Sequence, residues 1–509
     1  MRKNLTPVTI LLGLAAVIGT WVLLQQILFE LAGAYHTDTA IYLTVARGVL
    51  NGLTPYADLY ENKPPGIFLL AALSLKLFGD VTLLTALQAL ILMLFPFCLL
   101  MPVLYGRSFS PRGSIRALVA WMIGCALALY AAAMAGTLLP ESFGAFFGCA
   151  FVAVVATRQR FTWAVTAVLS LLLACAVGIK EPFVLSTLAG ALLVLPSLRS
   201  TQRLVLPVLI TAAAGIQAMI LLGYLWPYVT IDLAHIFGFH LFNAWGTVGE
   251  PLWLRTIDIP RIFWNLWSVS PVLPFIIAPL WIGSLVLLLR RESVRTARLS
   301  VLARWLAASW LTTLAVGLTG DFYGHHFVFA VPLYAGCALV CLREWDARIV
   351  PQIRMIVPGV LTAALIAFFF TLDTNYAGAI EGWKQWAAPR QEAAAVLDDV
   401  MDRCKVDRYF DFIDRPEGFY GFTRHSPYGP IFTEYGRFIG VLQVYLDGFV
   451  TALEEAPIMV MRTDAEGVSV DPQTAASLKK VFTEKAWECA GPGFTQPKEY
   501  RILFREGAR

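Results

Sequence analysis

The stretch Gly66-Ile-Phe-Leu-Leu-Ala-Ala-Leu-Ser-Leu-Lys-Leu-Phe78 decides how the chain is threaded through a membrane. It is apolar, but at about thirteen residues it is too short to cross a hydrocarbon core of roughly 30 Å. Counting it as a span would place every later arginine-rich loop on the outer side, against the positive-inside rule. We therefore predict that the segment lies in the outer membrane interface, with Lys76 extending toward water.

The composition of the whole chain makes the bilayer its main solvent. Of the 509 residues, 58% are hydrophobic and 15% are charged, and the mean hydropathy is +0.66. Soluble domains carry more charge and less apolar area. The net charge of +4 is spread over short loops between apolar runs, so it does not indicate nucleic-acid binding. The first run, Pro7 to Phe29, is long enough to span and lacks a small-residue cleavage site, which predicts a retained helix.

Apolar runs of spanning length predict about eleven transmembrane helices. They lie at 7–29, 82–105, 115–135, 139–157, 161–179, 182–197, 204–226, 270–289, 300–318, 326–342 and 350–371. The loops rich in arginine then all fall on one side, which the positive-inside rule makes cytoplasmic. The first outer loop runs from 30 to 80, a second large one from 227 to 269, and the chain ends outside.

The composition changes after Leu372, where the apolar runs stop. We predict a transmembrane catalytic domain at 1–371 and a small extracytoplasmic α/β domain at 372–509. In the second domain helical periodicity occurs at 389–404, 436–456 and 474–489, and short β-type runs occur at 408–413, 458–461 and 500–504.

Cys404 and Cys489 belong to this outer domain, whereas the other cysteines lie in or beside apolar runs. An oxidising compartment permits a disulfide between them, but their spacing does not distinguish a bridge from two free thiols in a small core. Both alternatives stay open.

Candidate chemistry begins in the first outer loop. Asp38, Tyr42 and Val45 share one face of a predicted helix, because they are spaced i, i+4, i+7. Asp38 also stands directly before a run of apolar residues with helical periodicity. Its alternative role is therefore the N-cap of that helix. Lys63, held by the extended Pro64-Pro65 pair, is either a lysine that extends from a helix end or a point charge for a lipid-borne phosphate. Together with Asp38, it favours the second interpretation.

Two further charged sites interrupt the outer ends of apolar runs: Glu141 after Pro140, and Lys180 followed by Glu181. Ionisable groups at such depths are functional candidates. The alternative is an ion pair of Lys180 with Glu141 or Glu181 that only joins helices.

The last outer hairpin reads Gly320-Asp-Phe-Tyr-Gly-His325-His326. It places hydrogen-bond donors and aromatic rings on the same side. A zinc site needs more ligands than two adjacent histidines. The sequence therefore gives no firm cofactor prediction; a divalent metal stays open as an alternative but is not supported by the sequence.

These motifs together resemble a known family. The pattern Asp38…Tyr42…Gly52-Leu-Thr-Pro-Tyr56…Lys63-Pro-Pro-Gly66…Leu77-Phe-Gly79, then Pro140-Glu141, Lys180-Glu-Pro182 and a late outer His/Tyr hairpin, is similar to GT-C glycosyltransferases related to the protein O-mannosyltransferases and the lipid A aminoarabinose transferase. The resemblance covers most of the membrane region. It implies a GT-C fold with juxtamembrane helices on the periplasmic face of a bacterial inner membrane.

The resemblance also implies an activity: transfer of a sugar from a polyprenyl-phosphate donor to a cell-envelope glycan, lipid or protein outside the cytoplasm. It makes Asp38 the catalytic aspartate and Lys63 the donor-phosphate lysine, with Lys180 as a second basic position. Where the family often has a second acid, Thr39 follows Asp38. The remaining candidates are side chains expected to line the substrate cavity. They are Tyr42, Tyr56, Glu61, Glu141, His240, Tyr323, His325 and His326.

The chemistry of such a donor needs the same residues. The leaving phosphate gains charge and the acceptor hydroxyl needs a base, which Lys63, Lys180 and Asp38 supply. A single essential carboxylate predicts inversion at the anomeric carbon, and Glu141 is the candidate for a second carboxylate in a retaining reaction. Two other functions remain open: a ligase or polymerase that transfers a glycan preassembled on a polyprenyl diphosphate, and a transporter of lipid or sugar. Transporters usually show matching halves and helices interrupted at midplane.

Overall fold

The structure is a computed structural model of the whole chain. The residues that it describes are 7–35, 37–105, 111–135, 138, 140–158, 161–234, 236–237, 251–264, 266–318, 324–348, 351–372, 376–411, 417–429, 443–462 and 480–507. The predicted cavity residues His240 and Tyr323 lie outside these ranges.

Residue contacts divide the chain into two compact units. Unit 1 comprises Met1–Ala32, Thr85–Ala218 and His235–Tyr376, and unit 2 comprises Gly33–Leu84, Met219–Ala234 and Ala377–Arg509. By contacts, therefore, most of the first outer loop belongs to the same unit as the C-terminal part of the chain. The two units are described separately below.

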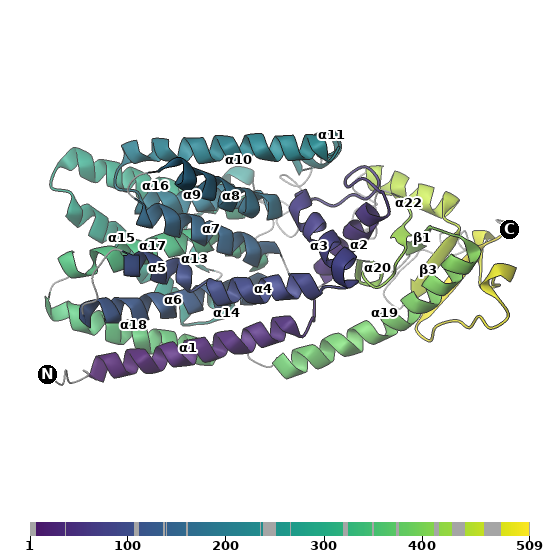
Figure 1. Cartoon of the computed structure of the whole chain (residues 1–509), viewed down its shortest axis with the longest axis horizontal. Coiled ribbons are helices and arrows are strands. Elements are labelled where there is room, and N and C mark those ends of the chain that lie inside the picture. Colours follow the sequence, from purple (N-terminus) through teal and green to yellow (C-terminus); the bar gives the residue numbers. More distant parts are fainter. Residues whose placement is uncertain are drawn as a thin grey trace. The chain divides into compact units, whose positions relative to one another are not determined.

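Unit 1 is a bundle of helices that run side by side (Figure 1). Its elements are α1 (Pro7–Leu31), α4 (Thr82–Leu94), α5 (Phe97–Tyr105), α6 (Pro111–Ala135), α7 (Pro140–Thr157), α8 (Trp163–Ile179), α9 (Phe183–Val194), η1 (Leu198–Thr201), α10 (Gln202–Leu221), α12 (Leu252–Ile257), α13 (Arg261–Trp264), α14 (Leu266–Val269), α15 (Leu273–Arg291), α16 (Arg295–Gly317), η4 (Gly324–Ala330), α17 (Val331–Arg348) and α18 (Pro351–Thr371).

Within the described residues, nine helical stretches are long and apolar enough to cross a membrane. They coincide with nine of the eleven predicted spans, so the chain is a multi-pass membrane protein. The other two predicted spans form shorter helices, α8 with 17 residues and α9 with 12. A nearby proline ends each of these helices. Helix α8 is capped by Lys180, two residues before Pro182, and α9 is capped by Leu195, directly before Pro196. A 12-residue helix is only about 18 Å long, less than the hydrocarbon thickness.

Burial shows which helices are central. In the span that contains α17, 94% of the residues are buried, against 17% in the span that contains α10. The exposed side chains of α10 are apolar, among them Ile216, Ile220 and Leu221. An apolar exposed face on a spanning helix is suited to contact with lipid. Thus α17 is the centre of the bundle and α10 lies at its periphery.

Glycines let the helices α7, α9 and α17 approach one another closely. A methyl group added at Gly190 in α9 would overlap the carbonyl oxygen of Pro332 in α17, and one added at Gly144 in α7 would overlap the ring of Phe183 in α9. One added at Gly336 would lie 2.8 Å from the oxygen of Gly190. Small residues at helix contacts are a general device of membrane bundles. They fix α7, α9 and α17 against one another.

Unit 2 contains two helices from the first outer loop, two short helices from Met219–Ala234, and a mixed α/β part from the C-terminal region (Figure 1). Its elements are α2 (Thr37–Leu50), α3 (Pro65–Phe78), α11 (Leu225–Pro227), the π-helix η2 (Tyr228–Leu233), α19 (Tyr376–Cys404), β1 (Arg408–Asp411), α20 (Glu417–Tyr420), β2 (Ser426–Pro427), α22 (Gln443–Glu455), β3 (Ile458–Arg462), β4 (Phe482–Thr483), η5 (Glu488–Ala490) and β5 (Tyr500–Arg505).

In the described part of unit 2, five strands form one sheet in the order β2-β1-β3-β5-β4. Strand β1 is parallel to β2 and β3, and β5 is antiparallel to β3 and β4. Buried aromatic and branched side chains, such as Phe410, Ile458 and Ile502, form its core. The three predicted β-type runs are thus confirmed, and the fold is mainly helical with a small C-terminal sheet, as expected.

One helix prediction in this region is wrong. The range 474–489 was expected to be helical, but Phe482–Thr483 pairs with β5 as strand β4. Residues 474–479 lie outside the described part. The side chain of Phe482 is buried, and its backbone pairs antiparallel with the edge of β5. This tertiary pairing outweighs the short helical periodicity of the local sequence.

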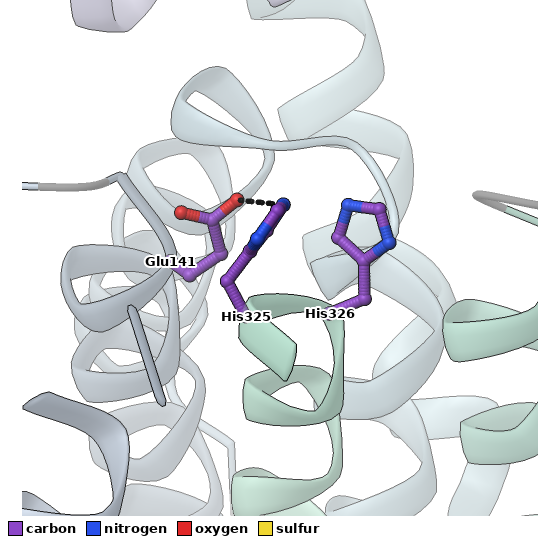
Figure 2. A group of neighbouring side chains, drawn as sticks. All are labelled: Glu141, His325 and His326. Carbon is purple, nitrogen blue, oxygen red and sulfur yellow. Dashed lines mark ion pairs between the residues drawn. The ribbon is translucent and has the colours of Figure 1, made fainter. Parts of the chain in front are cut away.

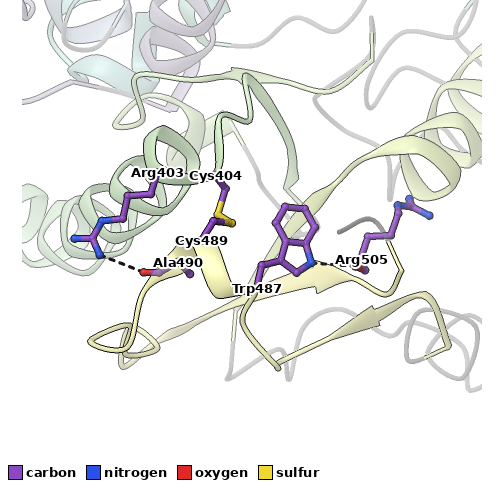
Figure 3. Close-up of a disulfide and its surroundings, with 6 residues drawn as sticks. All are labelled: Arg403, Cys404, Trp487, Cys489, Ala490 and Arg505. Carbon is purple, nitrogen blue, oxygen red and sulfur yellow. Dashed lines mark hydrogen bonds between the residues drawn. A yellow bond between two sulfur atoms is a disulfide. The ribbon is translucent and has the colours of Figure 1, made fainter.

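A disulfide joins Cys404 to Cys489 across 85 residues of sequence, which is the bridged alternative (Figure 3). It connects the end of α19 to the start of η5. Beside it, Arg403 Nη1 donates a hydrogen bond of 3.2 Å to the carbonyl of Ala490, and Trp487 Nε1 donates one of 3.2 Å to the carbonyl of Arg505. The bridge and these bonds hold the last part of the chain to α19.

The first outer loop is fastened to the C-terminal part of unit 2. Arg47 Nη1 on α2 donates a hydrogen bond of 2.9 Å to the carbonyl of Tyr420, and Asn51 Nδ2 donates one of 3.3 Å to Ser426 Oγ. Burial lowers the pKa of the Arg47 guanidinium from its ordinary value. A buried cation of this kind is retained only with strong acceptors, so α2 and the region of α20 form one structural piece.

Candidate active site

The first of two candidate clusters lies at one end of the bundle in unit 1. Glu141 occupies the first turn of α7, and Lys180 lies at the break between α8 and α9. Both side chains are buried, and Lys180 Nζ donates a hydrogen bond to Glu141 Oε1. A buried ion pair is strongly destabilised when one partner is removed, because the other charge is left in an apolar surrounding.

Two histidines complete this cluster from a different part of the chain. His325 and His326 lie on η4, directly before α17, and their rings are 4.2 Å apart. His325 Nε2 is 3.9 Å from Glu141 Oε1 (Figure 2). We call Glu141, Lys180, His325 and His326 the bundle cluster. The sequence placed these residues on the same side of the membrane, and the structure brings their side chains together.

Aromatic rings line the bundle cluster. Lys180 Nζ lies 5.4 Å from the centroid of the Phe329 ring, a cation–π distance. Phe329 packs edge-on against Phe183 and face-on against His326. Lys180 caps the end of α8, and Pro182 stands directly before Phe183, the first residue of α9. The break between the two helices therefore fixes the positions of both Lys180 and Phe183. The rings therefore fix the lysine and the histidines in an environment of low water content.

One buried acid in this region was missed from the sequence. Glu30, at the end of α1, is fully buried; it accepts a hydrogen bond of 2.8 Å from Gln26 Nε2 and one from the backbone of Leu138. Leu138 has a positive φ of 58°, an unusual conformation that needs such support. Glu30 thus stabilises the backbone at Leu138. Its signal in the sequence is a Gln-x-x-x-Glu pair inside an otherwise apolar span.

The second candidate cluster lies in unit 2. Asp38 is in the first turn of α2, which begins at Thr37, and its side chain is partly exposed. Tyr42 and Val45, on the predicted shared face, are buried, and the ring of Tyr42 lies 6.3 Å from that of Phe68 on α3. Asp38 is therefore inside the helix and not the residue before it. A carboxylate in the first turn is stabilised by the positive end of the helix dipole.

Lys63 stands at the entrance to α3 with carboxylate and amide partners. Its Nζ donates hydrogen bonds of 3.0 Å to Glu61 Oε1 and 2.6 Å to Asn62 Oδ1. The hydroxyl of Tyr56 donates one of 2.8 Å to the Lys63 carbonyl. Tyr56 has a φ of 69°, and its ring also contacts that of Phe68. We call Glu61, Asn62, Lys63 and Tyr56 the loop cluster; three of them are predicted site residues.

The interfacial helix also has the expected form. Helix α3 spans Pro65–Phe78, with Pro65 in its first turn and Gly79 at its end in the left-handed conformation, φ 79°. Its exposed side chains include Leu73, Leu77 and Phe78. An apolar exposed face beside the exposed Lys76 suits a helix lying in a membrane interface.

The predicted site residues thus fall into two groups. Asp38, Tyr42 and the loop cluster belong to unit 2, and the bundle cluster belongs to unit 1. Each group has a base or acid together with a lysine, a combination suited to proton transfer and to stabilising an anion. In the described residues, the bundle cluster also contains the three side chains that come close enough to hold a metal ion: Glu141, His325 and His326.

Together, the spanning helices and the buried charges at the helix ends define a polytopic membrane protein with an ionisable site in its bundle. In sequence, no family model and no curated protein matches the chain. In structure, the chain is similar to ArnT from Cupriavidus metallidurans, in a crystal structure bound to undecaprenyl phosphate. The likeness has a TM-score of 0.51 at 13% identity and covers 96% of this chain and 98% of that one. The chain therefore has the GT-C fold, as its motifs predicted.

Proposed function

We propose that the chain is a membrane glycosyltransferase that transfers a sugar from a polyprenyl phosphate to an extracytoplasmic acceptor. The observation that supports this best is the shared fold, because it extends over nearly the whole chain to a protein seen with undecaprenyl phosphate bound. A fold alone does not define a reaction. Asp38 and the loop cluster, which belong to the same unit, supply a base and a cation of the kind that this reaction requires.

In the proposed reaction the acceptor hydroxyl attacks the anomeric carbon of the sugar in one step. Asp38 takes the hydroxyl proton as the new bond to the anomeric carbon forms. The bond from that carbon to the phosphate oxygen breaks, and polyprenyl phosphate leaves with the electron pair. One displacement inverts the configuration at the anomeric carbon. Lys63, which belongs to the same unit as Asp38, stabilises the charge that develops on the phosphate. The sequence motif around Lys180 makes it the second candidate for binding the donor phosphate.

Both lysines have a carboxylate partner in the structure, Glu61 for Lys63 and Glu141 for Lys180. Their charges are thus compensated before a donor binds, which lowers the cost of keeping them at apolar helix ends. A phosphate that approaches either lysine has to share it with the carboxylate.

We further propose a location for the reaction. The arginine-poor ends of the spans carry Asp38, Lys63, Glu141 and Lys180, and this side is extracytoplasmic by the positive-inside rule. The acceptor is then a glycan, lipid or protein of the cell envelope, and the membrane is the bacterial inner membrane. No nucleotide-sugar site is needed, because the activated sugar arrives on lipid.

Replacing Asp38 by Asn tests the mechanism. Asn keeps the size of the side chain and most of its ability to bond the first turn, but it does not accept the hydroxyl proton. Sugar transfer by the purified protein in liposomes should fall by roughly 10²–10⁴-fold, the usual value of a positioned base. The loss of the helix-dipole interaction should cost only about 0.3–1 kcal/mol of stability.

Asp58→Asn is the matched control, since Asp58 lies in the same loop and only accepts a hydrogen bond of 2.7 Å from the Thr54 amide. That variant should transfer sugar at the wild-type rate. If Asp38 serves only the helix, Asp38→Asn is stable and fully active, while Asp38→Ala is unstable. That pattern would remove the aspartate from the mechanism.

A further inference from the structure

We propose that Glu141, His325 and His326 form a binding site for a divalent transition-metal ion, for which Zn²⁺ is the best suited. The three side chains come from α7 and η4, far apart in sequence. One ligand atom from each lies within 4.8 Å of the others, and in the described part of the chain no other three His, Cys, Asp or Glu side chains come together in this way. Figure 2 shows the three side chains next to one another, with His325 between Glu141 and His326.

The distances fit a shared ion. Zinc binds imidazole nitrogen and carboxylate oxygen at about 2.0–2.2 Å, so two of its ligand atoms lie roughly 3.4 Å apart in a tetrahedron and at most about 4.2 Å. His325 Nε2 and Glu141 Oε1 are 3.9 Å apart, within this range. The three ligand atoms lie within 4.8 Å of one another, so the widest pair needs to close by at most about 1.4 Å to reach the tetrahedral separation, which side-chain rotation provides.

The type of ligand selects the ion. Two imidazoles and one carboxylate suit zinc and its neighbours, whereas Mg²⁺ and Ca²⁺ prefer sites made of oxygen. Three protein ligands leave a fourth position open, which is the arrangement of catalytic zinc sites. Glu141 and His326 are buried, while the His325 side chain is 24% exposed. The ion would therefore be held from inside the bundle and reached from the His325 side.

Lys180 orients the carboxylate and competes for it. Its ammonium is bonded to Glu141 Oε1, the oxygen that faces His325, while Glu141 Oε2 is buried without a hydrogen-bond partner in the described residues. An ion bound at Oε1 would displace the ammonium from that oxygen. Lys180 would then be released toward an anion beside the metal. This consequence rests on the proposed function, whereas the metal site does not.

The test is zinc binding by the purified full-length protein after removal of any affinity tag. Bound metal is measured by mass spectrometry, and affinity by competition with a chromophoric chelator. Wild-type protein should bind one zinc per chain. Glu141→Gln, His325→Gln and His326→Gln should each bind at least about 100-fold more weakly, since each loses a ligand. His425→Gln, in unit 2, is the histidine control and should bind as the wild type does.

The Lys180→Met variant distinguishes two alternatives. Either Glu141, His325 and His326 bind a metal ion, or Glu141 only pairs with Lys180 beside the two histidines. Removing one positive charge near the ion should tighten zinc binding about tenfold or more. Absence of zinc binding by the wild type, equal binding by the three ligand variants, or weaker binding by Lys180→Met would each overturn the proposal. The His325 variant keeps the test valid if the Glu141 variant misfolds, because the His325 side chain is partly exposed and Glu141 is buried. Zinc binding without sugar transfer would leave the metal site standing and remove only the proposed function.

Discussion

At the scale of single residues, the charged side chains at the helix ends are held in pairs. Lys63 pairs with Glu61 and Lys180 pairs with Glu141, and all four side chains are at most 18% exposed. Such pairs are expensive to keep unless each charge is compensated, so ionisable pairs beside apolar helices are functional candidates. The Lys180–Glu141 pair is more deeply buried than the Lys63–Glu61 pair. We therefore expect the loss of Lys63 to reduce the stability of the protein less than the loss of Lys180.

Replacing Lys63 by Ala should affect the donor more than the fold. A charge-assisted bond to phosphate contributes about 1.5–3 kcal/mol, so kcat/KM for the lipid donor should fall roughly 10- to 150-fold. Stability should change by only about 1 kcal/mol, because the pair with Glu61 is partly solvated. The measurements are transfer rate against donor concentration and thermal unfolding in detergent.

Lys76→Ala is the control, since Lys76 lies on α3, the helix that follows Lys63, and is exposed. It should leave both quantities unchanged. Equal loss of stability in Lys63→Ala and Glu61→Ala, with donor use intact in both, would show that the lysine only pairs with its neighbour.

The sequence identified most of these side chains but not their partners. Lys63, Glu141, Lys180 and the two histidines could be selected because ionisable groups at the ends of apolar runs are rare. The choice of Glu141 over Glu181 as partner of Lys180 depends on the contact of α7 with α8 and α9, which no local pattern shows. Glu30 was overlooked because the predicted span ended at residue 29, which made Glu30 the first residue of the following loop. In the structure α1 continues to Leu31.

At the scale of elements, the bundle cluster depends on close helix packing. Lys180 precedes α9, and the histidines precede α17. These two helices meet where Gly190 faces the backbone of Pro332. A side chain in place of Gly190 would push α9 away from α17. Lys180 would then move away from His325 and His326.

Gly190→Ala should therefore destabilise the bundle by about 1–3 kcal/mol, the usual cost of overpacking, although Ala is the better helix former. Sugar transfer should fall with it. Thermal unfolding in detergent gives the first quantity and the liposome assay the second. In the control, Gly215→Ala on α10, the added methyl group meets nothing within 4 Å, so stability should stay the same or rise. Equal behaviour of the two variants would refute the packing account.

The boundaries of the elements show where sequence reasoning succeeds. Long apolar runs predicted nine spans, because hydropathy over about 20 residues is dominated by the bilayer. The prolines that follow Lys180 and Leu195 were inside or beside predicted spans, and they shorten α8 and α9. In the C-terminal part, strands with buried aromatic residues were found, but β4 was not, because its pairing with β5 is a tertiary contact.

At the scale of the whole molecule, the account requires that the C-terminal part lies outside the cytoplasm. We expect Glu484→Cys, a position whose side chain is 65% exposed, to react with a membrane-impermeant maleimide in spheroplasts. Ser293→Cys, exposed between α15 and α16, should react only after lysis. Native thiols should interfere little, since Cys404 and Cys489 are bridged and the others are buried or half-buried. The reverse labelling pattern would invert the topology and exclude an extracytoplasmic active site.

The central claim concerns the donor, and the most direct measurement is transfer by the wild-type chain in liposomes from a panel of radiolabelled polyprenyl-linked sugars. The panel holds single sugars on a polyprenyl phosphate and matched glycans on a polyprenyl diphosphate, with envelope extract as acceptor. The account predicts that label moves to the acceptor from one of the monophosphate donors and from none of the diphosphate donors. Transfer of a glycan from the diphosphate carrier, or passage of the labelled lipid across the bilayer without transfer, would contradict it.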